Sequence, residues 1–174
     1  MNQVQENKYP GFIYAIVASY LESQEAEEVN KFADGVIYRY ENAQGHTFKN
    51  GLLHSFDDKP AVVLPDECRE EWYKDGKFHR DGDLPAEIDP EGEIWWQDGL
   101  IHRDGDKPAF IVSDDGARIW YRRGLKHRDG DKPAHVCGSE EEWWVNGVQH
   151  RDGDLPAFMS PQEHRWYKNG VLHR

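Results

Sequence analysis

The sequence predicts a mainly β protein, an elongated single-sheet array of antiparallel β-hairpins preceded by one N-terminal α-helical cap. Three observations predict this fold. A unit of 23 to 25 residues recurs along most of the 174-residue chain. Nearly every unit carries an Asn-Gly or Asp-Gly dipeptide between strand-forming residues, which is typical of a type I′ hairpin turn. The segment before the repeats has its apolar residues at helical spacing instead.

Residues 1–35 are expected to form the helical cap, with Gly35 as its stop. The apolar positions on one helical face are Ile13, Ile16, Val17, Tyr20 and Leu21. A repeat array needs a terminal element with an apolar inner face and a polar outer face, so we interpret this helix as a cap over the first hairpin edge. A helix that docks on a partner is the alternative. The alternating residues 36–40 are expected to begin the sheet.

Residues 36–174 are expected to form the repeats. Their boundaries are about 46–70, 71–94, 95–119, 120–142 and 143–165, with a partial repeat at 166–174. The turn glycines lie 23 or 25 residues apart, at Gly51, Gly76, Gly99, Gly124, Gly147 and Gly170. The length varies after each Pro-Ala pair, so a loop or strand end is expected there. A second turn, as at 89–92 or 114–116, then returns the chain to the next aromatic pair.

Each hairpin is expected to pair residues across its two-residue turn. Around Asp98-Gly99 this pairs Trp96 with Ile101, and Trp95 with His102. Arg123-Gly124 departs from the Asx-Gly rule. The Asp-Gly-Asp-x-Pro run that follows most hairpins breaks the strand before the next extended piece.

The Trp-x-x-Gly-x-x-His frame, followed by Arg-Asp-Gly-Asp-x-Pro-Ala, resembles the MORN (membrane occupation and recognition nexus) repeat and its variants. The likeness is strongest to repeats of this kind in hypothetical proteins of bacteriophages, large DNA viruses and some bacteria. It covers about residues 46–174. The resemblance implies an elongated single sheet that serves as a protein-interaction or dimerisation scaffold, with membrane binding in some members. His-Arg-Asp-Gly-Asp stands here where the family has His-Gly-x-Gly.

Strand alternation separates two faces of the hairpins. One face carries Trp95, Leu100 and His102 and their equivalents, and its uniformity between repeats predicts a stacked core. The other face carries the second aromatic residue and an arginine, the residue types that anchor interfaces. We expect a protein partner to bind there, at Tyr73, Trp96, Tyr121, Trp144, Tyr167, Arg80, Arg103, Arg128 and Arg151. The alternative is that each arginine packs flat on its own aromatic neighbour and only solubilises the sheet.

Composition excludes several classes of function. The chain has 33 acidic and 21 basic residues, a net charge of −12, so direct binding of nucleic acid or of an anionic membrane is not expected. No apolar run is long enough to cross a bilayer and no export segment is visible, which predicts a soluble, cytoplasmic protein. Cys68 and Cys137 fall about three hairpins apart, so both are predicted to be free thiols.

These features predict a non-enzymatic scaffold without cofactor, catalytic residues or metal, because the ladder spreads His and Asp along an axis instead of converging them. One alternative is a small acidic viral or phage effector that inhibits a host factor by nucleic-acid charge mimicry. Another is a small-molecule binder with an aromatic pocket. The last strand, ending at Arg174, is expected to offer an open edge for a homodimer.

Overall fold

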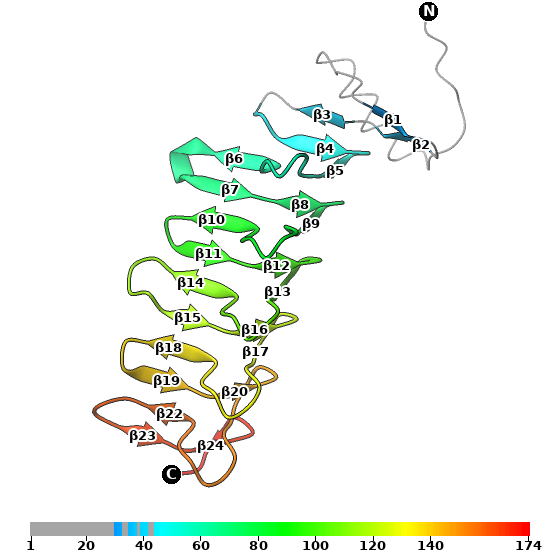
Figure 1. The fold of residues 1–174 in the computed structure, drawn as a ribbon. Helices are drawn as coiled ribbons and strands as arrows, with labels where there is room; N and C mark the ends of the chain where they lie inside the picture. The colour runs from blue at the N-terminus through cyan, green and yellow to red at the C-terminus, as the bar shows by residue number, and fades with distance from the viewer. Residues whose placement is uncertain (1–29, 33–34, 38, 42–43) are drawn as a thin grey trace, which may run out of the picture.

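A computed structural model describes residues 30–32, 35–37, 39–41 and 44–174. Over these residues the chain is mainly β, with one short 3-10 helix, η1 (Pro65–Glu67). The repeats stack in one direction, so that strands of successive repeats lie side by side along the array (Figure 1). The predicted mainly β array of antiparallel hairpins is confirmed for this part of the chain.

Ten short strands form one continuous antiparallel sheet along the array. In chain order they are β6 (Val62–Leu64), β7 (Arg69–Glu71), β10 (Glu87–Asp89), β11 (Gly92–Ile94), β14 (Phe110–Val112), β15 (Arg118–Ile119), β18 (His135–Cys137), β19 (Glu140–Glu142), β22 (Phe158–Met159) and β23 (His164–Arg165). Their spatial order follows their chain order, from β6 at one end to β23 at the other. Every full repeat therefore adds two strands, joined by the second turn that the sequence predicts.

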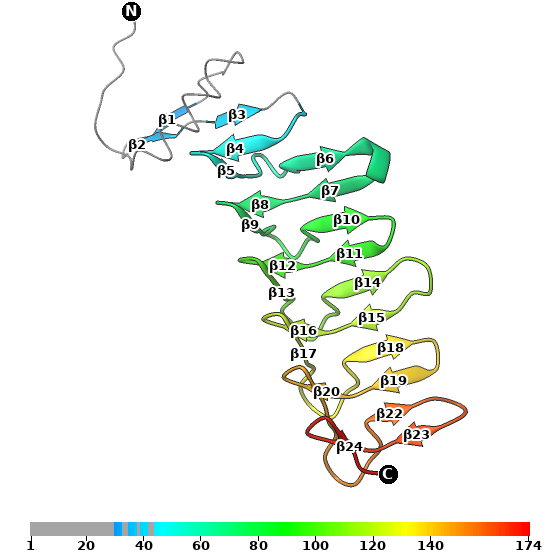
Figure 2. The same cartoon turned by 180° about the vertical axis from the view of Figure 1, so that it is seen from behind.

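A column of two-stranded hairpins runs beside the ten-stranded sheet (Figures 1 and 2). Its strand pairs are β8 (Tyr73–Lys74) with β9 (Lys77–Phe78), β12 (Trp96–Gln97) with β13 (Leu100–Ile101), β16 (Tyr121–Arg122) with β17 (Leu125–Lys126), β20 (Trp144–Val145) with β21 (Val148–Gln149), and β24 (Tyr167–Lys168) with β25 (Val171–Leu172). The predicted pairing of Trp96 with Ile101 is confirmed.

The expectation of one single sheet is wrong, because the first aromatic residue of each repeat divides the ladder. The Trp95 N–H donates to Ala109 O, just before β14, at 2.8 Å, whereas Trp95 O accepts from His102 N–H of its own hairpin at 3.0 Å. The strand before Trp95, β11, therefore pairs with β10 and with β14 in the ten-stranded sheet, and the strand after it, β12, pairs within its own hairpin. Each buried backbone N–H and C=O group needs a hydrogen-bond partner. Because the N–H and the C=O of Trp95 bond to different segments, the ten-stranded sheet ends and the hairpin begins at this residue.

The strands nearest the N-terminus form two small sheets. The short β1 (Asn30–Phe32) pairs with β2 (Gly35–Ile37), and β3 (Arg39–Glu41) pairs with β4 (Thr47–Lys49), which pairs with β5 (Leu52–Leu53). Residues 1–29, which hold most of the predicted helical cap, lie outside the described residues. At residues 30–32 the structure has a strand where the helix was expected to continue.

The hairpin turns adopt the predicted type I′ geometry, with positive φ at both central residues. Asp98 and Gly99 have φ of 51° and 82°, and even Arg123 has φ of 50° in its turn. An L-residue other than Asn or Asp is strained in this left-handed region. Arg123 therefore adopts a strained backbone conformation that the geometry of the repeat imposes.

The core is a narrow row that follows the boundary between sheet and hairpins. Its tryptophans are only 4–8% exposed: Trp72, Trp95, Trp120 and Trp143. Between them lie fully buried alanines: Ala61, Ala86, Ala109, Ala134 and Ala157. The Ala109 N–H donates to Ile119 O while Ala109 O accepts from Trp95, so each alanine joins two strands where no larger side chain fits.

Candidate protein-interaction surface

Each motif arginine lies on the first aromatic residue of its repeat, not beside the second. The Arg103 guanidinium carbon is 3.7 Å from the centroid of the Trp95 ring. The predicted placement of Arg103 on the face of Trp96 is wrong, because β13 ends at Ile101 and strand alternation does not extend beyond it. The same stacking, at 3.7–3.8 Å, places Arg80 on Trp72, Arg128 on Trp120 and Arg151 on Trp143.

An aspartate of the preceding repeat holds each of these arginines. Arg103 Nε and Nη2 donate to the two Asp83 carboxylate oxygens at 2.7 and 3.3 Å, and Nη1 donates to Pro108 O at 3.2 Å. The Trp95 indole N–H donates to Asp83 O at 3.1 Å. The Arg103 side chain is 14% exposed. The motif arginines thus bond one repeat to the next. They do not lie on the face that carries the second aromatic residues.

These bonds lower the pKa of the aspartates that accept them. Hydrogen bonds from Arg103 and Lys107 lower the pKa of Asp83 to about 2. Arg128 and Lys132 lower the pKa of Asp106 to about 2 in the same way. The second aspartate of the Asp-Gly-Asp run is therefore an ion-pair partner within the array.

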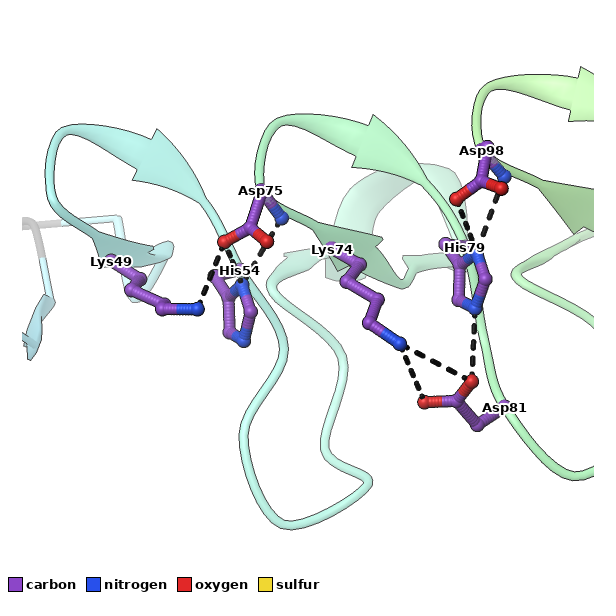
Figure 3. Close-up of polar contacts among 7 residues, drawn as sticks. All are labelled: Lys49, His54, Lys74, Asp75, His79, Asp81 and Asp98. Carbon is purple, nitrogen blue, oxygen red and sulfur yellow. Dashed lines mark hydrogen bonds and ion pairs between the residues drawn. The ribbon is translucent and has the colours of Figure 1, made fainter.

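The repeated histidines also connect neighbouring repeats (Figure 3). His79 Nδ1 accepts the Asp98 N–H of the next turn at 3.2 Å, and Nε2 lies 3.0 Å from Asp81. A backbone N–H only donates, so in the neutral imidazole that accepts this bond the proton is on Nε2, which donates it to the Asp81 carboxylate. The first hairpin repeats the Nδ1 contact, where His54 accepts from Asp75 at 3.1 Å. Burial, followed by the charge of Lys49, lowers the pKa of His54.

The second aromatic residues form part of a continuous column of side chains on one side of the hairpins. We call it the ring column: Tyr73, Phe78, Trp96, Ile101, Tyr121, Lys126, Trp144, Gln149, Tyr167 and Leu172. Apart from Leu172, which is exposed, its members are half-buried. The Phe78 ring stacks on Trp96 with centroids 5.0 Å apart, and Lys126 Nζ lies 4.9 Å from the Trp144 ring. All five predicted aromatic residues therefore lie in one column.

Carboxylates of the ten-stranded sheet hold several of these rings by their polar atoms. Trp96 Nε1 donates to Glu87 at 2.9 Å and Trp144 Nε1 donates to Glu142 at 2.7 Å, while the Tyr73 hydroxyl donates to Glu71 at 2.9 Å. Burial raises the pKa of Glu87, and His135, whose Nδ1 lies 3.4 Å from the carboxylate, lowers the pKa of Glu142. Sequence reasoning missed these carboxylates, although Glu71 and Glu142 each directly precede a pair of aromatic residues in the sequence.

Glu71 and Glu87 are themselves buried, at 8% and 6% exposure, and Arg69 pairs with both. Burial, followed by the hydrogen bond to Glu71, raises the pKa of the Tyr73 hydroxyl. Tyr73 and Trp96 therefore each bond a buried glutamate whose charge is paired with Arg69.

Aliphatic side chains form a second row, on the opposite face of the hairpins. We call it the aliphatic stripe: Leu52, Leu100, Leu125, Val145, Val148 and Val171, which are 39–68% exposed. The expectation that this face is a uniform core is therefore wrong beyond the first aromatic residue and the histidine. Leu100 lies against the turn of the following hairpin, because a Cβ placed on Gly124 would lie 3.5 Å from its side chain.

Small hollows lie between successive Arg-Asp-Gly-Asp loops, with volumes of about 150 to 380 Å³. The lining of the largest includes His102, Arg103, Asp104, Trp120 and Arg128. Only this one reaches the lower end of the volumes typical of ligand pockets. Among the described residues no three His, Cys, Asp or Glu side chains form a group that could hold a metal ion. Cys68 and Cys137 are free thiols, as predicted.

Comparisons of the chain with protein-family models, curated proteins and solved structures found no match. Within the part of the chain that the structure describes, no helix has the length and apolar character needed to cross a bilayer.

Proposed function

We propose that this chain is a non-enzymatic, MORN-like repeat scaffold that binds a protein partner along the ring column. The observation that carries the proposal is the column itself, which places one half-exposed Trp or Tyr in each of five successive hairpins. Trp and Tyr are the residue types most enriched among interface anchors. A cytoplasmic location belongs to the same proposal, since both cysteines are free thiols.

The hydrogen bonds to carboxylates support this use of the rings. Trp96 and Trp144 already have their indole N–H groups bonded to Glu87 and Glu142, so a partner has to cover only their apolar faces. Rings held in one rotamer lose little conformational entropy on binding. The motif arginines are not part of the proposed site, because their guanidinium groups already contact Trp and Asp side chains within the array.

Two alternatives have less support. Charge mimicry would use the first aspartate of each loop, and Asp81, Asp104 and Asp129 are about 80% exposed. Two strands per repeat separate these carboxylates by about 10 Å, whereas phosphates along one DNA strand rise by about 3.4 Å. Small-molecule binding would need a deeper apolar hollow than those between the loops.

The proposal is tested by quantitative capture of partners with three forms of the protein. The wild type is compared with a ring-column variant, Tyr73→Ala, Trp96→Ala, Tyr121→Ala and Trp144→Ala, and with the matched stripe variant Leu100→Ser and Leu125→Ser. The ring-column variant should lose the partners that the other two forms retain. The same partners bound equally by all three forms would defeat the assignment. Circular dichroism verifies that each variant is folded before capture.

A further inference from the structure

Exposed aliphatic side chains are concentrated in one place on this molecule. Ten large hydrophobic residues are exposed within the described part of the chain, and six of them make up the aliphatic stripe. An exposed apolar surface of this kind marks an interaction site. The stripe lies on the face opposite the ring column, so it is not explained by the proposed function.

We propose that the aliphatic stripe is a homodimer interface, in which two copies of the chain pack stripe against stripe in antiparallel orientation. The two-fold axis passes between the hairpins of Leu100 and Leu125. Leu100 of one subunit then faces Leu125 of the partner subunit, and the same contact recurs by symmetry. Any second copy has the same repeat spacing, so aliphatic groups meet in successive hairpins, as an isologous interface requires.

One pair of oppositely charged residues favours a second copy in antiparallel orientation. Lys77 interrupts the stripe at the hairpin before Leu100, and within the described residues it has no ion-pair partner. Asp152 follows the hairpin of Val148 and is 98% exposed, with only His150 beside it. The antiparallel arrangement places Lys77 at the level of Asp152 of the partner subunit, and it does so twice. A parallel two-fold arrangement would instead bring Lys77 against Lys77 of the partner subunit.

The open edge that the sequence suggested is a weaker candidate for the same dimer. β23 is the outermost strand of the described sheet, but the following Trp166 N–H already donates to Arg174 O at 2.9 Å. That bond takes the place of the bond from Trp143 N–H to Ala157 O in the preceding repeat. Part of the edge beyond β23 is therefore already occupied by the chain itself.

Sedimentation equilibrium of the full chain over the micromolar range tests the proposal. The wild type should show a concentration-dependent dimer. Leu100→Lys with Leu125→Lys should weaken it at least about tenfold, since both side chains lie at the centre of the interface. These residues are nearly half exposed, so the fold should tolerate the change. A wild type that stays monomeric, or a dimer that the lysines leave unchanged, would overturn the proposal.

A charge exchange tests the orientation. Lys77→Asp alone and Asp152→Lys alone should each weaken the dimer about two- to fivefold, whereas the double variant should restore it. The ring-column variant should dimerise like the wild type, which separates this interface from partner binding. Lack of rescue in the double variant would refute the antiparallel register.

Discussion

Arg103 lies flat on Trp95 and at the same time holds Asp83 of the preceding repeat. One side chain thus shields a core tryptophan, completes an ion pair and bonds Pro108 O. The same three contacts recur at Arg80, Arg128 and Arg151. The Arg-Asp-Gly-Asp motif therefore connects successive repeats through side-chain contacts, in addition to the backbone bonds of the sheet.

Arg103→Lys should lower the free energy of unfolding by about 1–2 kcal/mol, because an ammonium group neither stacks on Trp95 nor bonds a carboxylate in two places. Urea denaturation measures the change. Arg118→Lys is the matched control, since Arg118 is exposed in β15, and it should shift stability by less than about 0.5 kcal/mol. Equal effects of the two substitutions would argue against the bridging role.

Arg123→Asn should stabilise the protein by about 0.5–1 kcal/mol, because Asn tolerates the positive φ that Arg123 adopts. The reciprocal change Asn146→Arg, in the next hairpin turn, should destabilise by a similar amount. Thermal unfolding of both variants measures the pair. Shifts of the same sign in the two variants would contradict the turn-strain explanation.

Ala109→Val should destabilise the fold by about 1–3 kcal/mol, since Ala109 is fully buried between two strands and the extra methyl groups overfill the site. Chemical denaturation is the measurement. The control Ser139→Val adds bulk at an exposed position of a second turn and should have little effect. An Ala109→Val protein as stable as the wild type would show that the alanine row has room to spare.

Stability should fall with acidification below about pH 4. The pKa of Asp83 and of Asp106 is about 2 in the folded chain, below the unfolded value of about 3.9, so their ion pairs stabilise the fold above pH 4. This contribution is lost progressively as pH falls from about 4 through about 2. Denaturation midpoints measured from pH 7 to pH 2 should show it.

Asp83→Asn with Asp106→Asn should flatten that acid limb and lower stability at pH 7. Asp114→Asn serves as the control for removing an exposed carboxylate. An acid limb of unchanged slope in the double variant would assign the pH dependence to other groups.

The sequence predicted the hairpins well because their signals are local. Asp98-Gly99 specifies its turn, and the turn specifies the pairing of Trp96 with Ile101. It predicted a single sheet wrongly, because the switch at Trp95 depends on a hydrogen bond to Ala109, beyond the hairpin and its loop. Pairing between repeats is a long-range property that a local pattern does not contain.

The candidate site was only half predictable for a similar reason. The five aromatic positions follow from strand alternation, which holds as far as β13. Arg103 lies beyond the strand end, where the loop bends back over Trp95, so alternation placed it on the wrong side. The exposure of Leu100 could not be read from the sequence either, because a uniform row can be core or surface depending on what covers it.

Site-specific photocrosslinking tests partner binding along the ring column most directly. A benzophenone amino acid replaces Ile101, within the column, or Ile111, which pairs with Arg118 in the ten-stranded sheet and is not part of the column. Partner binding along the ring column predicts crosslinks to a partner protein from position 101 and few or none from position 111. Equal crosslinking from both positions, or crosslinks from position 111 alone, would contradict it.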